Sequence, residues 1–206
     1  MQLNSKNLII TFTRNPELGK CKTRLAKTVG DEAALRIYKY LLQHTEQVIK
    51  QIDADKAVYY SVKTRDNDIW DSKAYQKHQQ VGNDLGERMQ KAFENGFNSL
   101  YEKIIIVGSD LFDLEPRHID EAFKALNKND VVIGPAEDGG YYLLGMKTMH
   151  TSVFKNKNWG TESVCYDTLQ NLKNQKTSLL ETLNDIDLYE DLEHIEALQN
   201  IIKQND

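Results

Sequence analysis

The sequence predicts an α/β fold, a three-layer α/β/α sandwich built around a mixed, mostly parallel sheet. Strand-like and helix-like stretches alternate along the chain, as in folds made of crossover connections. The run Ile-Ile-Ile-Val at 104–107 is apolar throughout, which is typical of a strand covered by helices on both faces. With 206 residues, 40% of them hydrophobic, residues 1–206 are expected to form one domain with a sizeable core.

The N-terminal half carries three expected strands, each followed by helical or polar sequence. Residues 7–13 are apolar and β-branched, and 31–52 place apolar residues at helical spacing after Asp31, a plausible N-cap. A second strand is expected at 57–62, and the polar stretch 64–80 is expected to be irregular. The remaining elements of this half are a helix at 84–100 and the strand at 104–107.

The C-terminal half continues the alternation. A helix is expected at 116–127 because Pro116 suits a first helical turn. Two strands and two helices are then expected at 130–133, 141–146, 162–172 and 188–202. In such sheets ligands bind beyond the carboxyl ends of the strands, which directs attention to the segments 13–24, 108–113 and 134–142.

Composition excludes several classes of protein. Lys and Arg number 26 and Asp and Glu 31, so the formal net charge is −5, which argues against a nucleic-acid partner. No 18 apolar residues follow one another, so no membrane span or membrane partner is expected. Cys21 and Cys165 are far apart and indicate free thiols in a cytoplasmic protein. The histidines show no metal-ligand spacing and no GxSxG turn occurs, so hydrolysis by a catalytic triad has no support.

A basic loop follows the first strand. Its cations are Arg14, Lys20, Lys22 and Arg24, and Thr23 lies between the last two. Such a loop can hold a di- or triphosphate with its backbone N–H groups and its side chains. It contains neither the P-loop nor the Rossmann glycine pattern. The alternative is a solvated basic loop.

Carboxylates follow the most buried strand. Asp110 comes directly after it, where a divalent metal bridging phosphates is a common use for such a carboxylate. The alternative is a cap of a helix or turn. Asp113 is either a second carboxylate of this site or the cap of the helix that starts at Pro116.

Two glycine-rich segments complete the candidate site. At 134–142 the pair Glu137 and Asp138 precedes Gly139 and Gly140, which permit close approach to a ligand, and Tyr141, which offers a ring. The same residues would also suit an ordinary turn. At 80–89 the residues of interest are Gly82, Asp84 and Arg88, and Asp84 has the simpler interpretation of a helix cap.

Taken together, these segments resemble a bacterial family of small GT-A-fold glycosyltransferases of the arsenosugar-biosynthesis type. Residues 12–25 are similar to its FxKxPxxGxxKTRL signature, and four further motifs follow in the family's order, including Trp159-Gly160-Thr161. The resemblance covers about residues 7–195 and implies that residues 1–206 form a single domain of the nucleotide-diphospho-sugar transferase (GT-A-like) type. The sequence departs from the family's pattern at two positions. Phe112 stands in place of the proline of the SDxPxL motif, and Arg14 stands where lysine is commoner.

A second resemblance is to small nucleotidyltransferases that act on molybdopterin or phospholactate. Residues 184–187, Asn-Asp-Ile-Asp, are similar to their DIDTPEDL element, and 22–25 to their KSRL-like loop. These enzymes share the nucleotide-diphospho-sugar transferase fold.

The resemblances imply a metal-dependent transferase. A nucleotide-diphospho-sugar donor and a small-molecule acceptor are expected, with Mg²⁺ or Mn²⁺ held by Asp110 and Asp187. Asp110, Asp138 and Glu137 are the candidate catalytic residues. Phosphate or nucleotide binding is expected from Arg14, Lys20, Lys22, Thr23, Arg24, Gly82, Asp84 and Arg88, and substrate binding from Gly139, Gly140, Tyr141, Trp159 and Thr161. The alternatives are nucleotidyl transfer to a phosphorylated small molecule and a nucleotide-binding protein without turnover. A homo-oligomer is compatible with the sequence.

Overall fold

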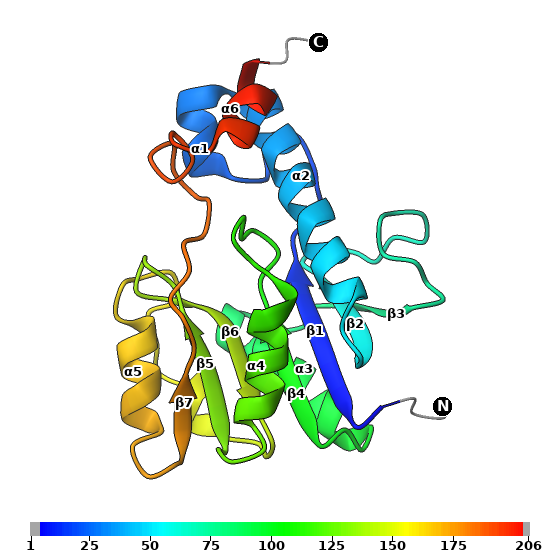
Figure 1. Ribbon diagram of the computed structural model, residues 1–206, viewed down its shortest axis with the longest axis vertical. Coiled ribbons are helices and arrows are strands. Elements are labelled where there is room, and N and C mark those ends of the chain that lie inside the picture. The colour runs from blue at the N-terminus through cyan, green and yellow to red at the C-terminus, as the bar shows by residue number, and fades with distance from the viewer. Residues whose placement is uncertain (1–4, 204–206) are drawn as a thin grey trace.

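A seven-stranded sheet organises the chain, with the strand order β3-β2-β1-β4-β6-β5-β7 (Figure 1). The computed structural model describes residues 5–203. Its strands are β1 (Asn7–Thr13), β2 (Asp55–Tyr60), β3 (Tyr75–Gln79), β4 (Lys103–Val107), β5 (Val131–Pro135), β6 (Tyr141–Met146) and β7 (Thr177–Leu179). Within this sheet only β6 runs antiparallel to its neighbours, β4 and β5. The prediction of a mixed, mostly parallel sheet is confirmed.

Helices cover both faces of the sheet. They are α1 (Thr23–Val29), α2 (Asp31–Lys50), α3 (Leu85–Asn98), α4 (Pro116–Ala125), the 3₁₀ helix η1 (Thr151–Phe154), α5 (Val164–Asn171) and α6 (Glu196–Lys203). Apolar residues of α2 and α4 pack with Ile9, Ile105 and Val132 on one face. On the other face α3 and η1 pack with Ile10 and Ile106. Alternate residues of the same strands therefore enter two different cores, which confirms the three-layer sandwich.

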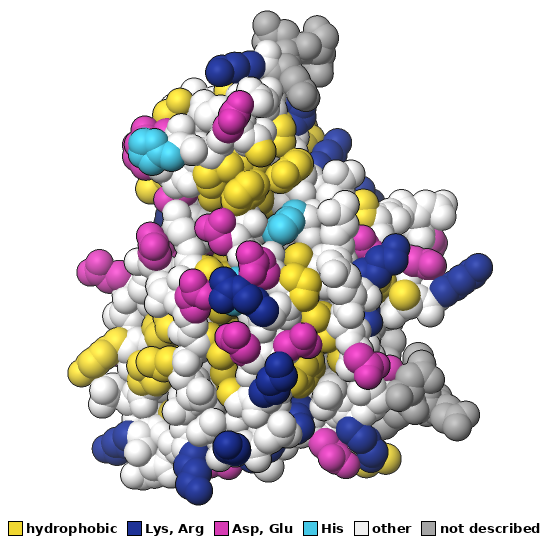
Figure 2. Space-filling model, viewed as in Figure 1, with side chains coloured by type: hydrophobic (Ala, Val, Ile, Leu, Met, Phe, Trp, Pro, Cys, Tyr) yellow, Lys and Arg dark blue, Asp and Glu magenta, His cyan; other side chains and the backbone are white. Residues whose placement is uncertain are grey.

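A third, smaller core lies beyond the carboxyl edge of the sheet. Leu25 of α1, Ile37 of α2 and Leu198 of α6 pack there with Ile186 and Leu192. Figure 1 shows these helices gathered at the top of the molecule, and Figure 2 shows hydrophobic side chains exposed below them on the same face. The C-terminal segment is thereby brought back over the end of β1.

Four elements were not predicted, and one of them is the 3₁₀ helix η1. β3 lies inside the stretch 64–80 that was expected to be irregular, α1 begins inside the expected basic loop, and β7 has three residues. β3 and β7 are the edge strands of the sheet. An edge strand has a neighbour on one side only and tolerates polar residues, so the Tyr-Gln-Lys-His-Gln sequence of β3 lacks the apolar signal of a central strand.

Two helix starts differ from the prediction. Gly30, at φ 84°, separates α1 from α2 and is the N-cap of α2, so Asp31 is the first helical residue and not the cap. The last helix begins at Glu196 instead of 188. The Asp191 carboxylate accepts hydrogen bonds from the backbone N–H groups of Asp187 and Leu188, which holds that stretch in a turn.

No helix within residues 5–203 has the length and apolar character needed to cross a membrane. Cys21 and Cys165 are both free, as predicted. The residues of the predicted domain 1–206 that lie outside the described range are 1–4 and 204–206.

Candidate functional site

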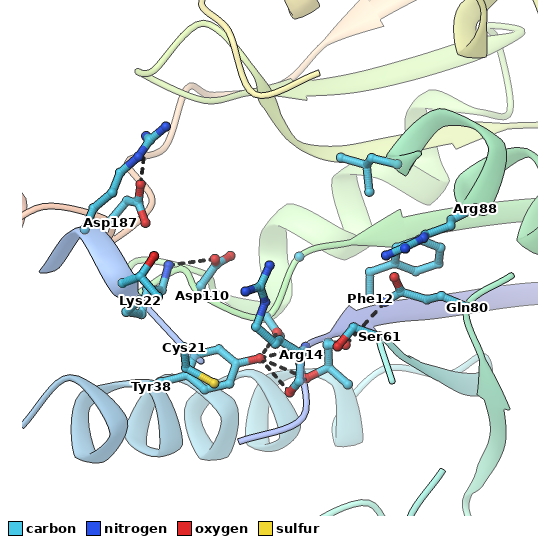
Figure 3. A pocket seen from close by; sticks show the side chains of 16 residues that line it. Phe12, Arg14, Cys21, Lys22, Tyr38, Ser61, Gln80, Arg88, Asp110 and Asp187 are labelled. Carbon is cyan, nitrogen blue, oxygen red and sulfur yellow. Dashed lines mark hydrogen bonds and ion pairs between the residues drawn. The ribbon is translucent and has the colours of Figure 1, made fainter. Parts of the chain in front are cut away.

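A cavity of about 490 Å³ opens at the carboxyl ends of β1 and β4 (Figure 3). Four cationic side chains and two carboxylates line it, and we call it the basic pocket. Those six residues are Arg14, Lys22, Arg24, Arg88, Asp110 and Asp187. They come from four separate parts of the sequence, and the sheet edge together with the third core brings them to one place.

Lys22 and Asp110 form the ion pair at the centre of this pocket. Lys22 Nζ lies 2.7 Å from Asp110 Oδ2, and the Lys22 side chain is only 6% exposed. Burial by itself would lower the pKa of Lys22, but the nearby carboxylates, Asp110 foremost, raise it above its ordinary value. Lys22 has a left-handed backbone (φ 49°) at the N-cap of α1, which turns the chain sharply between the loop and the helix.

The other cations are held at defined positions. Arg24 Nη1 pairs with Asp187 Oδ2 at 3.0 Å, and Arg14 Nη1 donates to the Lys20 carbonyl at 2.9 Å. Arg88 Nε donates to the Gly82 carbonyl at 3.0 Å, which fixes the guanidinium while leaving its terminal nitrogens toward the pocket. Positioned guanidinium and ammonium groups are well suited to phosphate oxygens.

Tyr38, which was not predicted as a site residue, fixes the backbone where β1 ends. Its hydroxyl accepts from the Arg14 N–H at 2.8 Å and donates to the Arg14 carbonyl at 3.0 Å. The same oxygen lies 3.2 Å from Thr13 Oγ1 and 3.4 Å from Ser109 Oγ. Tyr38 thereby ties α2 to the ends of β1 and β4. Tyr38 lies on the apolar face of α2, so its position in the sequence indicated only a core residue.

A second cavity, of about 170 Å³, adjoins the first and shares Leu85, Gly108 and Asp110 with it. Asp110, Asp138 and Asp185 line it, and the described lining residues include no Lys or Arg. We therefore call it the acidic pocket. Its remaining polar and aromatic lining includes Tyr141, Tyr142, Trp159 and Thr161.

Asp185 is a site residue that was not proposed from the sequence. Burial first, and then the charges of Asp110 and Asp138, raise the pKa of Asp185 to about 6. The Ile186 N–H donates to the Asp110 carbonyl, and Asp185 bridges to Leu111, so the 184–187 segment runs beside the end of β4. The Asn-Asp-Ile-Asp element had pointed to this segment, but it did not distinguish Asp185 from Asp187.

Most predicted site residues line one of these two cavities. Arg14, Lys22, Thr23, Arg24, Arg88, Asp110 and Asp187 line the basic pocket. Asp138, Gly140, Tyr141, Trp159 and Thr161 line the acidic pocket. The expectation that the turns after β4 and β5 open at the same edge of the sheet is confirmed, because Asp110 and Asp138 line one cavity.

The other predicted residues lie outside both linings. Lys20 pairs with Glu17 at 2.9 Å, and its side chain is 70% exposed. Glu137 is exposed, while Gly139 (φ 85°) packs closely against the Glu162 backbone. Gly82 serves as the acceptor for Arg88, and Asp84 caps α3 by accepting from the Glu87 N–H at 2.8 Å.

The structure excludes one of the alternatives for the carboxylates after β4. Glu115 is the N-cap of α4, so the interpretation of Asp113 as that cap is wrong. Asp110 bonds to Lys22 across the pocket.

The donor set for a divalent metal is partial. Within residues 5–203 no group of three or more His, Cys, Asp and Glu side chains is arranged to hold an ion. Asp110 pairs with the Lys22 ammonium, and the charges of Asp187 and Asp185 also raise the pKa of Lys22, so negative charge is concentrated at this end of the pocket. Mg²⁺ is commonly held by one or two carboxylates together with substrate phosphates, and this set fits that type of site.

Residues 42–161 match the sequence model of the family described as "Uncharacterized protein conserved in bacteria (DUF2064)". The match covers more than half of the chain. The protein belongs to this family. Curated relatives are distant: a 2-phospho-L-lactate guanylyltransferase of Methanocaldococcus jannaschii is 25% identical over 64% of this chain and 56% of its own length. The guanylyltransferase of Methanocaldococcus vulcanius is 23% identical over 97% of this chain and 100% of its own length.

Solved structures confirm the nucleotide-diphospho-sugar transferase fold. A candidate nucleotide-diphospho-sugar transferase from Desulfovibrio desulfuricans G20 superposes with a TM-score of 0.84 and 28% identity, covering 97% of this chain and 98% of that one. The 4-diphosphocytidyl-2C-methyl-D-erythritol synthase of Anaerococcus prevotii has a TM-score of 0.60 and 10% identity, covering 94% and 96%, and shares the fold alone.

Proposed function

We propose that the protein is a glycosyltransferase that uses a nucleotide-diphospho-sugar donor. The observation that carries this proposal is the junction of two cavities of opposite character at Asp110. The basic pocket suits a diphosphate, and the acidic pocket suits a neutral sugar, whose hydroxyls donate hydrogen bonds to carboxylates. The likeness to the Desulfovibrio desulfuricans protein supports the same donor class.

In this proposal the cations of the basic pocket promote departure of the nucleoside diphosphate. An acceptor hydroxyl attacks C1 of the sugar, the bond from C1 to the diphosphate oxygen breaks, and negative charge builds on the leaving diphosphate. Lys22 and Arg24 lie where they can stabilise that charge in a partly desolvated site, which is the dominant contribution in such transfers. Asp138 is the proposed group that accepts the acceptor's proton or binds the sugar hydroxyls.

A divalent ion, Mg²⁺ or Mn²⁺, is part of the proposal. Asp110 and Asp187 would hold it together with the phosphates, and the Asp185 carboxylate lines the acidic pocket together with Asp110. When bound, the ion supplies Lewis-acid stabilisation of the diphosphate.

Nucleotidyl transfer is the second candidate, favoured by the guanylyltransferase relatives. In this reaction a phosphate of the acceptor attacks the α-phosphorus of a nucleoside triphosphate, and pyrophosphate leaves. Four cations in the basic pocket suit a triphosphate as well as a diphosphate. The acidic pocket, however, would repel a phosphorylated acid, because Asp138 and Asp185 line it and no Lys or Arg among the described residues does.

Thermal shifts with nucleotides and nucleotide-sugars, each with and without Mn²⁺, test the two reactions. We expect a metal-dependent shift with a diphospho-sugar that exceeds the shift with triphosphates, followed by detection of a glycosylated product by mass spectrometry. A shift with triphosphates and pyrophosphate release would favour the second candidate. Ligand binding without any product would favour a nucleotide-binding protein that lacks turnover.

Asp138→Asn and Glu137→Gln form a matched pair for the role of the acidic pocket. Both side chains are exposed, but Asp138 lines this pocket, whereas its neighbour Glu137 lines neither cavity. Asp138→Asn should lower kcat much more than it weakens nucleoside diphosphate binding, because its contact is made with the transferred group. Glu137→Gln should change neither quantity. Equal losses of affinity and turnover in Asp138→Asn would assign the turn to the nucleotide instead.

A further inference from the structure

A third cavity, of about 230 Å³, lies on the α2 side of the sheet's carboxyl edge, beyond β1 and β2. Residues of α2 form one wall, and the segment 65–70, which follows β2, forms the other. We call it the lateral pocket. Thr13 and Arg14 are the residues that it shares with the basic pocket, so the two cavities lie back to back across the end of β1.

The inner surface of the lateral pocket is apolar and aromatic. Leu42 of α2, Tyr60 at the end of β2 and Trp70 line it, and these side chains are 5%, 1% and 2% exposed. Trp70 is held edge-on by Tyr75 of β3, with the ring centroids 5.1 Å apart. A rigid aromatic floor of this kind favours burial of a small apolar or aromatic group.

The polar lining has an excess of unpaired positive charge. Lys39 and Arg65 line the pocket, and within residues 5–203 neither side chain makes a hydrogen bond or ion pair, although the charge of Arg65 helps to lower the pKa of Glu17. The carboxylate in the lining, Asp68, is already satisfied. It accepts from the Tyr60 hydroxyl at 2.5 Å and from the Trp70 N–H at 3.1 Å, and it pairs with Lys77 Nζ at 2.8 Å.

We propose that the lateral pocket binds a small molecule that combines an apolar ring with one anionic group, a carboxylate or a phosphate monoester. The ring packs against Ile69, which is 37% exposed, above the buried floor of Trp70 and Leu42, and the anion lies between Lys39 and Arg65. This site is separate from the basic pocket, and it does not depend on the transfer reaction proposed above. Because Arg14 lines both cavities, a ligand in either cavity lies beside the carboxyl end of β1.

Isothermal titration calorimetry with phenyl phosphate and with benzoate tests the site and distinguishes the two anions. Benzyl alcohol carries the ring without the charge, and inorganic phosphate carries the charge without the ring. We expect one of the aromatic anions to bind at least about tenfold more tightly than either control, because a charge-assisted contact and ring burial each contribute. Equal affinity for benzyl alcohol, or no binding of either anion, would overturn the proposal.

Substitutions locate the bound anion. Lys39→Gln and Arg65→Gln should each weaken binding about tenfold or more. Lys50→Gln on α2 and Lys63→Gln on the neighbouring loop are matched controls, since both are exposed and lie outside the lining, and they should leave the affinity unchanged. Arg24→Gln reports on the basic pocket. Loss of binding in Arg24→Gln, with Lys39→Gln and Arg65→Gln unaffected, would place the anion in the basic pocket and refute a separate site.

Discussion

Lys22 holds an ammonium group in a buried position, and such a group is costly unless carboxylates compensate for the water it has lost. Asp110 compensates directly, and Asp187 and Asp185 add to the local negative charge. A phosphate group entering the pocket would offer Lys22 a second anionic partner. The residue is therefore already in place for an anionic ligand before that ligand binds.

Arg24 and Lys20 are four residues apart in the sequence, but the structure gives the two cations different environments. Arg24 lines the basic pocket, whereas Lys20 points away and pairs with Glu17. Arg24→Gln should weaken a nucleoside diphosphate by about ten- to a hundredfold, the value of one charge-assisted contact, and leave a bare nucleoside unaffected. Lys20→Gln should change neither affinity. Calorimetric titration of both ligands measures this, and equal effects of the two substitutions would contradict the assignment.

We expect His78 to make the stability of the fold depend on pH. It lies in β3, stacked on Tyr59 with ring centroids 4.8 Å apart, and burial lowers its pKa below the ordinary value of 6.5. Below about pH 6.5 the unfolded chain binds this proton more readily than the folded chain does, so the free energy of unfolding falls with decreasing pH. His78→Asn should remove the part of this decrease in unfolding free energy that comes from protonation of His78.

Urea unfolding of the wild type and of His78→Asn between pH 8 and the lowest pH at which both fold would measure the difference. His194→Asn is the control, because the His194 side chain is 89% exposed. The difference between the wild type and His78→Asn should change as the pH falls through 6.5, while His194→Asn follows the wild type. A pH-independent difference for His78→Asn would mean that packing against Tyr59, not protonation, sets its effect.

At the scale of elements, α3 and the segment that carries Trp159 are fitted to each other at Gly86. A β-carbon at Gly86 would lie 2.5 Å from the Phe154 carbonyl oxygen and 2.5 Å from Trp159 Cζ2. The first turn of α3 thereby determines where the Trp159 ring lies in the acidic pocket. The start of α3 is itself set by the Asp84 cap.

Gly86→Ala should therefore push Trp159 away and destabilise the fold by about 1–3 kcal/mol, as overpacking does. Alanine is normally the better helix former, so a gain of stability would show that the contact yields easily. Asn98→Ala, at the exposed end of α3, is the control and should have little effect. Thermal denaturation followed by circular dichroism measures both.

At the scale of the whole molecule, the third core places the C-terminal segment over the basic pocket. Ile186 and Leu192 pack with residues of α1, α2 and α6, and the Asp187 carboxylate between them reaches Arg24. The candidate site is therefore assembled from both ends of the chain, and its integrity depends on packing that is remote from any ligand.

Leu198→Ala tests this dependence. Leu198 is fully buried in the third core, so its truncation should cost about 2–5 kcal/mol and loosen the 184–192 segment. Nucleoside diphosphate affinity should fall together with stability. Leu188→Ala, at a side chain that is 45% exposed, should alter neither. Urea unfolding measures the stability of both variants, and calorimetric titration measures their affinity for a nucleoside diphosphate. An unchanged affinity in a destabilised Leu198→Ala would show that the 184–192 segment is held independently of α6.

The sequence by itself determined the class of fold and most of the basic pocket. A continuous apolar run such as 104–107 has few alternatives to a buried central strand. Arg14 and Asp110 follow such strands directly, at the carboxyl ends where sheets of this kind bind ligands. The helices with strong apolar periodicity and the Asp84 cap followed from local patterns that do not depend on distant residues. These features are encoded over short stretches, which is why they could be predicted.

Tertiary structure decided what depends on residues far apart in the chain. The edge strand β3 has a polar sequence and exists because β2 offers it a partner. Lys22 lies in the pocket and Lys20 outside it because the left-handed turn at Lys22 and the Tyr38 hydroxyl fix the course of the loop. Asp185 lines the acidic pocket, where burial and the charges of Asp110 and Asp138 raise its pKa. Burial and charge at one position are set by the packing of the whole chain, so the sequence near Asp185 did not reveal this.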